Sequence, residues 1–181
     1  YLVLPTVMVP QIDKLLASTS TTNITQTGSK MQNLLENVSQ LMRTYTNLEF
    51  VIVTLGKLGC LWFSQDSSFY LSSQRKVDKY SEILAKLNAC KSLEICNFVY
   101  ENNAESKTKR NGLFIKACAS LTLPQSKIID STGAGDAFIS GILISLYDFD
   151  PCTHSNVNAM LHQANSMGAE NCTVMGAHGQ S

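Results

Sequence analysis

An amphipathic helix followed at once by a buried strand is the pattern that most constrains the fold of this chain. Ser29 and Gln32 form a capping-box pair, and apolar residues then recur at three- and four-residue spacing as far as position 45. Residues 50–55 (FVIVTL) are a continuous run rich in β-branched residues that ends at Gly56, which is typical of a strand buried on both faces of a parallel sheet. This succession predicts an α/β fold.

The middle of the chain adds further strand signals around a long polar segment. Residues 59–63 (GCLWF) predict a return strand after a tight turn, and residues 112–123 restore an apolar, strand-like pattern. Residues 64–111 are polar and carry much of the charge, around an amphipathic stretch at 81–93. We expect an insertion that leaves the sheet. Its basic run, 107–110, is either a solvated loop, the more common case, or a phosphate patch.

Charge and apolar content exclude several kinds of partner. The chain has 181 residues, of which 44% are hydrophobic, enough to bury one core of ordinary size. Fourteen Lys and Arg residues balance fourteen Asp and Glu residues, so no net field attracts nucleic acid or an anionic membrane surface. The longest apolar runs fall far short of the roughly 20 residues of a membrane-spanning helix. We expect a soluble, cytoplasmic protein that binds no nucleic acid and no membrane.

Cysteine usage and the first residues bear on compartment. Six cysteines are scattered without a C-x-x-C pair, so reduced and mostly buried thiols are expected. Residues 1–9 predict a strand end that leads into a short helix at 11–17, without the charged region and cleavage site of a signal peptide. Because the chain opens at Tyr1 rather than Met, we expect part of a longer polypeptide. The expected compartment is the cytoplasm, and an organelle is the alternative if the longer polypeptide carries a targeting segment.

The segment 128–146 carries the most chemical information. A short apolar strand end meets a turn of small residues and then a strongly apolar helix, and backbone N–H groups beside such glycines form an anion site. Asp136 alone is explained by the helix dipole. However, Asp130 and Asp136 flank the same turn, and two carboxylates would repel an anion unless one does proton chemistry or a cation is present. The pair therefore favours phosphoryl transfer with a metal ion.

Two common glycine fingerprints do not match this turn or the earlier one. The dinucleotide-binding motif would need a third glycine where Phe138 stands. Gly56-Lys57 is followed by Leu58 instead of Ser or Thr, so it is not a Walker A loop. Neither a Rossmann dehydrogenase nor a P-loop NTPase is supported.

The two glycine turns do resemble a known family. Residues 130–138 (DSTGAGDAF) closely resemble the C-terminal signature of the ribokinase-like, or pfkB, carbohydrate kinases, and residues 53–59 (VTLGKLG) resemble its nucleotide-contacting V-T-L-G-x-x-G segment. Residues 164–165 and 175–178 resemble the helix and loop that close the adenine pocket in that family. The resemblance implies a ribokinase-like three-layer fold with a mainly parallel central sheet. Residues 1–181 would be the C-terminal, nucleotide-binding part of a single kinase domain, without its N-terminal half and lid.

The resemblance implies a role for each residue of the signature. Asp136 would be the general base that takes the proton from the acceptor hydroxyl. Asp130 and Thr132 match positions that help to form a site for a monovalent cation such as K⁺. The backbone amides of three consecutive residues would form the anion hole, namely Gly133, Ala134 and Gly135.

The resemblance also assigns the nucleotide site. Thr54, Gly56 and Gly59 would line it, and Asn165 would lie near the base. For Thr54 and Gly56, an ordinary exit from a strand into a turn is an equally good explanation.

The implied activity is ATP-dependent phosphorylation of a sugar hydroxyl, with ATP and Mg²⁺. The family's N-x-x-E motif, which positions Mg²⁺ and phosphate, is expected just after the first strand, where residues 5–9 read PTVMV. Either that register differs, the metal is held differently, or activity has been lost. The long insertion is similar to that of a plant-type subgroup resembling ketohexokinase. Together with the missing motif, this insertion favours an inactive structural or assembly subunit. A nucleoside kinase, and a homodimer or larger assembly, remain open.

Overall fold

The computed structural model describes residues 24–69, 74–101, 112–148 and 154–175, with the side chains of the first helix described from Leu34 onward. The predicted helix and strand at the start of this region are both present, as α2 (Ile24–Thr44) and β1 (Val51–Thr54). The helix begins ahead of Ser29, so the expected capping pair lies inside α2 and does not start it. The strand and helix expected within residues 1–17 lie outside the described residues.

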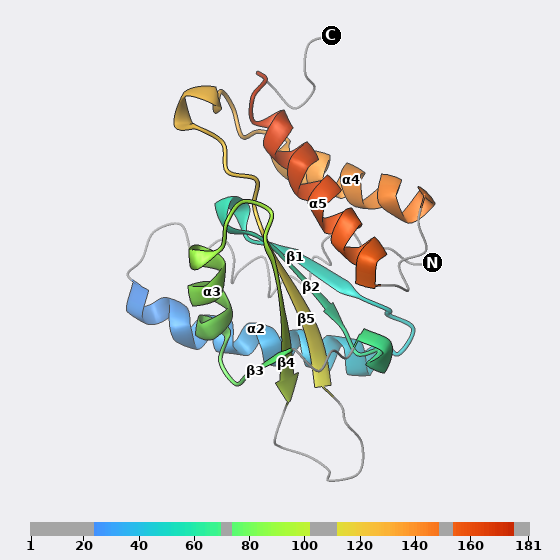
Figure 1. Ribbon diagram of the computed structural model, residues 1–181. Helices are drawn as coiled ribbons and strands as arrows, with labels where there is room; N and C mark the ends of the chain where they lie inside the picture. The colour runs from blue at the N-terminus through green and yellow to red at the C-terminus, as the bar shows by residue number, and fades with distance from the viewer. Residues whose placement is uncertain (1–23, 70–73, 102–111, 149–153, 176–181) are drawn as a thin grey trace. The chain divides into compact units, whose positions relative to one another are not determined.

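Four further strands follow β1 in the described residues, namely β2 (Gly59–Ser64), β3 (Arg75–Val77), β4 (Ile95–Glu101) and β5 (Gly112–Ala119). Together they form a five-stranded sheet in the order β1-β2-β5-β4-β3 (Figure 1). Only β3 and β4 form a parallel pair, in which Arg75 lies opposite Phe98, and the sheet is otherwise antiparallel. The expected mainly parallel sheet is therefore wrong. A tight turn, η2 (Gly56–Leu58), makes β1 and β2 a hairpin, and an apolar run signals burial without signalling strand direction.

In its described part, residues 64–69 and 74–101, the polar segment does not leave the sheet. It contributes β3, α3 (Tyr80–Ala89) and β4, a strand-helix-strand unit, and β4 lies next to β5 in the strand order. Tyr80, Ile83 and Leu87 are buried along one side of α3 at three- and four-residue spacing. The expected excursion is wrong because the polar residues occupy the exposed positions of short elements, as Arg75 and Lys76 do beside buried Val77. The basic run 107–110 lies outside the described residues.

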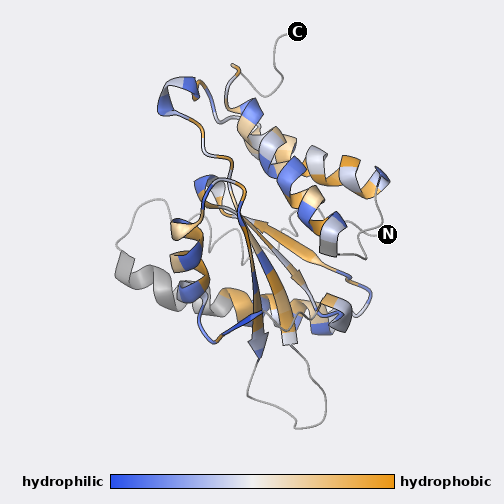
Figure 2. Ribbon diagram, viewed as in Figure 1, coloured by the Kyte–Doolittle hydropathy of each residue, from blue (hydrophilic) through white to orange (hydrophobic). Residues whose placement is uncertain are grey.

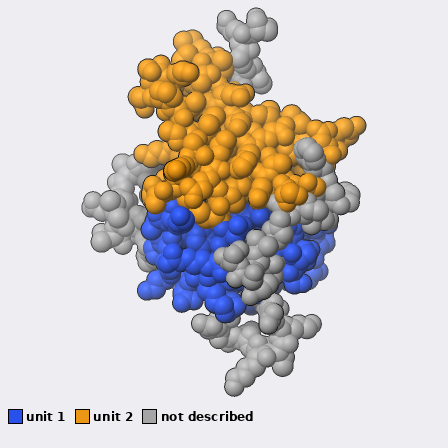
Figure 3. Space-filling model, viewed as in Figure 1, with its two compact units in different colours: residues 1–53, 62–87, 97–116 blue, residues 54–61, 88–96, 117–181 orange. Residues whose placement is uncertain are grey.

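Two compact units divide the chain (Figure 3). Unit 1 comprises residues 1–53, 62–87 and 97–116, and its core contains Trp62, which stacks on Phe50 at 6.3 Å and meets Phe69 edge-on at 4.7 Å between ring centroids. Most residues along β1 and β5 are hydrophobic (Figure 2). Within unit 1, buried Lys116 on β5 donates from Nζ to Asn97 Oδ1 at 3.3 Å.

Unit 2 comprises residues 54–61, 88–96 and 117–181 and contains α4 (Ala134–Asp148) and α5 (His154–Asn171). Small residues let these two helices approach closely. A Cβ on Gly141 would lie 2.7 Å from Ala164 Cα, and one on Gly168 would lie 3.1 Å from the carbonyl oxygen of Ala134. None of the helices in the described ranges combines the length and the apolar character needed to cross a membrane.

Candidate anion site at the first turn of α4

The glycine turn predicted from the sequence forms the N-terminus of α4. Gly133 has φ +79°, a left-handed conformation that glycine adopts without steric cost, and α4 begins at the next residue. Asp130 Oδ1 accepts the Thr132 N–H at 2.9 Å, and Ala137 N–H donates to Gly133 O at 2.9 Å as the helix starts. The turn is thus shaped by its own backbone and by one carboxylate.

Several N–H groups of this turn have no protein acceptor. Within the described ranges, the N–H groups of Gly133, Gly135 and Asp136 donate to no group, whereas that of Ala134 donates to Ser131 O at 3.2 Å. A Cβ built on Gly135 would meet nothing within 4 Å, so this part of the turn is open. Unpaired amides at the positive end of a helix attract anions. Two of the three amides assigned to the anion hole are therefore available, and that of Ala134 is engaged.

The carboxylate of Asp136 is exposed in the first turn of α4. Its position beside the unpaired amides is that of a group able to accept a proton from a hydroxyl bound there. The same position also suits a carboxylate that complements the helix dipole.

The C-terminal end of α5 holds the glycine turn in place. Asn171 Nδ2 donates to Thr132 O at 2.7 Å, and Ile129 N–H donates to Cys172 O at 2.9 Å. Close packing of Gly168 against Ala134 adds a third contact. Sequence reasoning did not assign Asn171 to the site, because a polar residue at a helix end carries no signal of a contact with a turn 39 residues earlier.

The turn at 54–59, the second segment predicted to bind the nucleotide, is also held in shape by backbone hydrogen bonds and by the conformations of its glycines. Thr54 is half-buried at the end of β1, and Leu55 N–H donates to Gly59 O at 2.7 Å. Gly56 has φ +57° and Gly59 has φ +110°. A Cβ on Gly59 would collide with the Cys118 carbonyl oxygen and lie 2.7 Å from Ser120 N. Both glycines are therefore required by the chain's own geometry, whether or not a nucleotide binds.

Asn165, assigned to the adenine pocket, lies in the interior of unit 2. Its side chain donates from Nδ2 to Leu161 O at 2.9 Å, and the same nitrogen lies 3.4 Å from Cys60 Sγ and 3.3 Å from Cys118 Sγ. As a hydrogen-bond partner, Cys118 raises the pKa of the buried Cys60 thiol, and burial raises that pKa further. Hydrogen bonding with Cys60 lowers the pKa of Cys118, although burial opposes this change. The amide nitrogen of Asn165 thus serves the packing of this thiol pair.

All the predicted site residues belong to unit 2. Residues of α5 contact the glycine turn that precedes α4, and they also contact the residue that follows the 54–59 turn. Asn165 reaches Cys60, which directly follows the 54–59 turn, while Gly168 and Asn171 reach the glycine turn of α4. Within the residues that the structure describes, no backbone–backbone hydrogen bond joins the two turns directly. In the tail, Met175 is exposed, and residues 176–178 lie outside the described residues.

The two residues assigned to a monovalent cation offer hard oxygen ligands. Carboxylate and carbonyl oxygens are the atoms that K⁺ and Mg²⁺ prefer. In the structure Asp130 Oδ1 already accepts the Thr132 N–H, and Thr132 O already accepts Asn171 Nδ2. The donor chemistry therefore suits such an ion, which would have to share Asp130 Oδ1 with the Thr132 N–H and the Thr132 carbonyl oxygen with Asn171 of α5.

A scan against protein-family models gave no match, and neither the curated proteins nor the solved structures contain a match to this chain. The kinase resemblance therefore depends on the sequence motifs alone, at residues 53–59, 130–138, 164–165 and 175–178.

Proposed function

We propose that this chain is the nucleotide-binding part of an ATP-dependent sugar kinase with the ribokinase-like fold. The observation that carries the proposal is the first turn of α4, where unpaired N–H groups and the exposed carboxylate of Asp136 lie within a few residues of each other. Catalysis of phosphoryl transfer needs mainly positioning and charge stabilisation, which such a turn supplies.

In this proposal each group has one task. The amides of Gly133 and Gly135 stabilise the negative charge of the transferring phosphoryl group. Asp136 accepts the proton of the attacking hydroxyl. Mg²⁺, when bound with ATP, would neutralise phosphate charge. A nucleoside kinase would use the same chemistry. It would differ from a sugar kinase in the pocket that binds the acceptor, and the residues of these two turns do not form that pocket.

The test is Asp136→Asn in the complete polypeptide that carries this chain. The amide keeps the size and much of the hydrogen bonding of the carboxylate but cannot act as a base, so we expect unchanged ATP affinity and turnover lower by about 10²–10⁴. Asp148→Asn, the same change at the exposed far end of α4, is the matched control and should leave both quantities unaltered. An active wild type whose Asp136→Asn variant keeps full turnover would exclude the catalytic role.

A catalytically inactive relative, retained as a structural or assembly subunit, is the second candidate. It is favoured by Asn165, whose amide nitrogen is engaged inside unit 2 and is not free to contact a nucleotide base. This candidate predicts no ATP binding by calorimetry and no phosphorylation across a panel of sugars and nucleosides. Saturable ATP binding with turnover would exclude it.

A further inference from the structure

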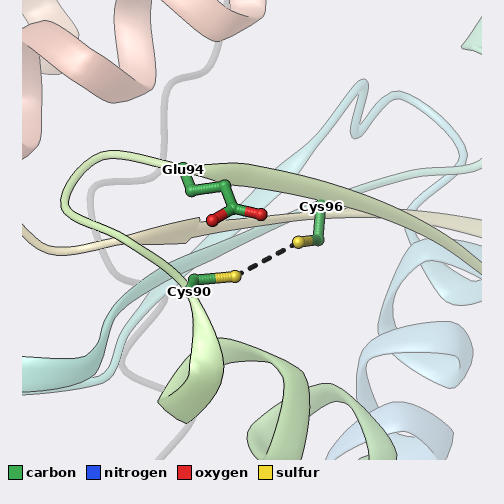
Figure 4. Close-up of side chains that lie close together, drawn as sticks. All are labelled: Cys90, Glu94 and Cys96. Carbon is green, nitrogen blue, oxygen red and sulfur yellow. Dashed lines mark hydrogen bonds between the residues drawn. The ribbon is translucent and has the colours of Figure 1, made fainter.

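Three metal-ligating side chains, none of them assigned to the proposed kinase site, meet where α3 ends and β4 begins. Cys90 follows α3 directly, Glu94 directly precedes β4, and Cys96 is the second residue of β4. Because alternate residues of an extended chain lie on the same side, Glu94 and Cys96 share a face. The short loop between helix and strand brings Cys90 back onto that face, where its Sγ lies 3.3 Å from Cys96 Sγ and the Glu94 carboxylate lies alongside (Figure 4).

The loop that makes this cluster is fixed by backbone hydrogen bonds on both sides. Glu94 Oε2 accepts the Lys91 N–H at 2.9 Å, which orients the carboxylate. Ala119 N–H donates to Glu94 O at 2.9 Å and ties the loop to the end of β5. Leu93 has φ +60°, and no other non-glycine residue of the described ranges has a positive φ. The cluster is thus held by a defined and locally strained turn.

The ligand atoms are close enough for a single ion. One ligand atom from each of Cys90, Glu94 and Cys96 lies within 4.8 Å of the other two. A tetrahedral ion with Zn–S bonds of about 2.3 Å places its two sulfur ligands about 3.8 Å apart. The observed 3.3 Å separation therefore has to open by roughly half an ångström, a small side-chain rotation. A disulfide would need about 2.05 Å, so its sulfurs would have to approach by more than about 1 Å.

The donor set selects the kind of metal. Thiolates are soft ligands that favour Zn²⁺ and similar ions, whereas Mg²⁺ and Ca²⁺ favour sites made of oxygen alone. We propose that Cys90, Glu94 and Cys96 form a Zn²⁺ site with three protein ligands and a fourth position open to water. Cys90 and Glu94 are half-buried, so an ion can reach the site from solvent on their side.

Direct titration tests this proposal without any assay of kinase activity. The reduced, chelator-treated chain is titrated with Zn²⁺ against a chromophoric chelator, and with Co²⁺ to record thiolate charge-transfer and tetrahedral d–d bands. We expect one ion per chain. Cys90→Ser, Cys96→Ser and Glu94→Gln should each weaken Zn²⁺ binding by at least about tenfold, since loss of a direct ligand exceeds the effect of outer groups. The serine variants should also lose the thiolate-to-cobalt band, with circular dichroism confirming the fold.

Cys172→Ser is the matched control, because Cys172 is also a half-buried cysteine of unit 2 and its Sγ donates to Gly168 O at 3.4 Å. It should keep the wild-type affinity. As a second measurement on the wild type, Zn²⁺ should protect Cys90 and Cys96 from alkylation, read by peptide mass spectrometry, and should leave Cys172 unprotected. Wild-type affinity in both Cys90→Ser and Cys96→Ser would overturn the proposal. So would a Cys90–Cys96 disulfide in the unreduced chain combined with no metal binding after reduction.

Discussion

Substitution of Lys116 should change how the stability of the fold depends on pH. Lys116 lies on β5 with 3% of its surface exposed, and its Nζ donates to Asn97 Oδ1 at 3.3 Å. Burial lowers the pKa of this ammonium group from 10.5 to about 8. In the unfolded chain the group is solvated and keeps its ordinary pKa.

The sign and size of the effect follow from linkage between protonation and folding. Between pH 8 and 10.5 the unfolded chain holds a proton on Lys116 that the folded chain has released, so the free energy of unfolding rises with pH across this window. One pKa unit corresponds to about 1.4 kcal/mol, so the full rise is roughly 3 kcal/mol. Below pH 8 both states carry the charge and the contribution to the slope disappears.

The assay is urea unfolding of wild type and Lys116→Met at a series of pH values from 7 to 10.5. Methionine has a similar length and no titrating group, so the difference in unfolding free energy between the two proteins isolates Lys116. We expect the variant to be the more stable protein at pH 7 and to lose roughly 3 kcal/mol of this advantage by pH 10.5. A flat difference for Lys116→Met across this pH range would contradict the expected release of a buried proton.

Two further substitutions test the turns of unit 2. Gly59→Ala should lower the free energy of unfolding by more than about 3 kcal/mol, because the new Cβ meets the backbone at the end of β5. Gly56→Ala places its Cβ in open space and should lower that free energy by only about 1–2 kcal/mol. Similar losses in the two variants, measured by chemical unfolding, would contradict the close approach at Gly59. Asn165→Ala should lower stability by about 1–3 kcal/mol, since it removes a buried hydrogen bond, and should leave ATP affinity unchanged. A loss of ATP affinity at constant stability would instead place Asn165 at the nucleotide.

Local sequence patterns predicted the positions of individual helices and strands better than they predicted the direction and order of the strands in the sheet. The β-branched run at 50–55 and the return strand at 59–63 correspond to β1 and β2. β2 is buried along its whole length, whereas in β1 only Val51 and Val53 are buried, so β1 is not buried on both faces as the apolar signal of this run predicted. Strand direction and neighbours leave no such signal, and β5 pairs with β2 across more than forty intervening residues. Within 64–111, the polarity of β3 and of the loops concealed two strands that belong to the same sheet.

The candidate site shows the same limit. The glycine turn and the helix after it could be predicted, since left-handed glycine and a small-residue helix start are local features. The engagement of Ala134 N–H and the contact from Asn171 depend on turn geometry and on α5, which residue types alone do not specify. The cluster of Cys90, Glu94 and Cys96 could be found only in three dimensions, because its spacing matches no common metal motif.

The short strand β3 has a consequence for how the protein behaves at high concentration. It is the last strand in the sheet order, has three residues, and exposes Arg75 and Lys76 beside buried Val77. The exposed ion pair between Lys76 Nζ and Glu101 Oε2, at 2.9 Å, contributes little to stability. However, a short edge that bears two positive side chains is a poor template for another chain's strand. An added strand would find few hydrogen-bonding groups and would have to bury these exposed charges. This edge of the sheet is therefore protected against the growth of intermolecular β-structure.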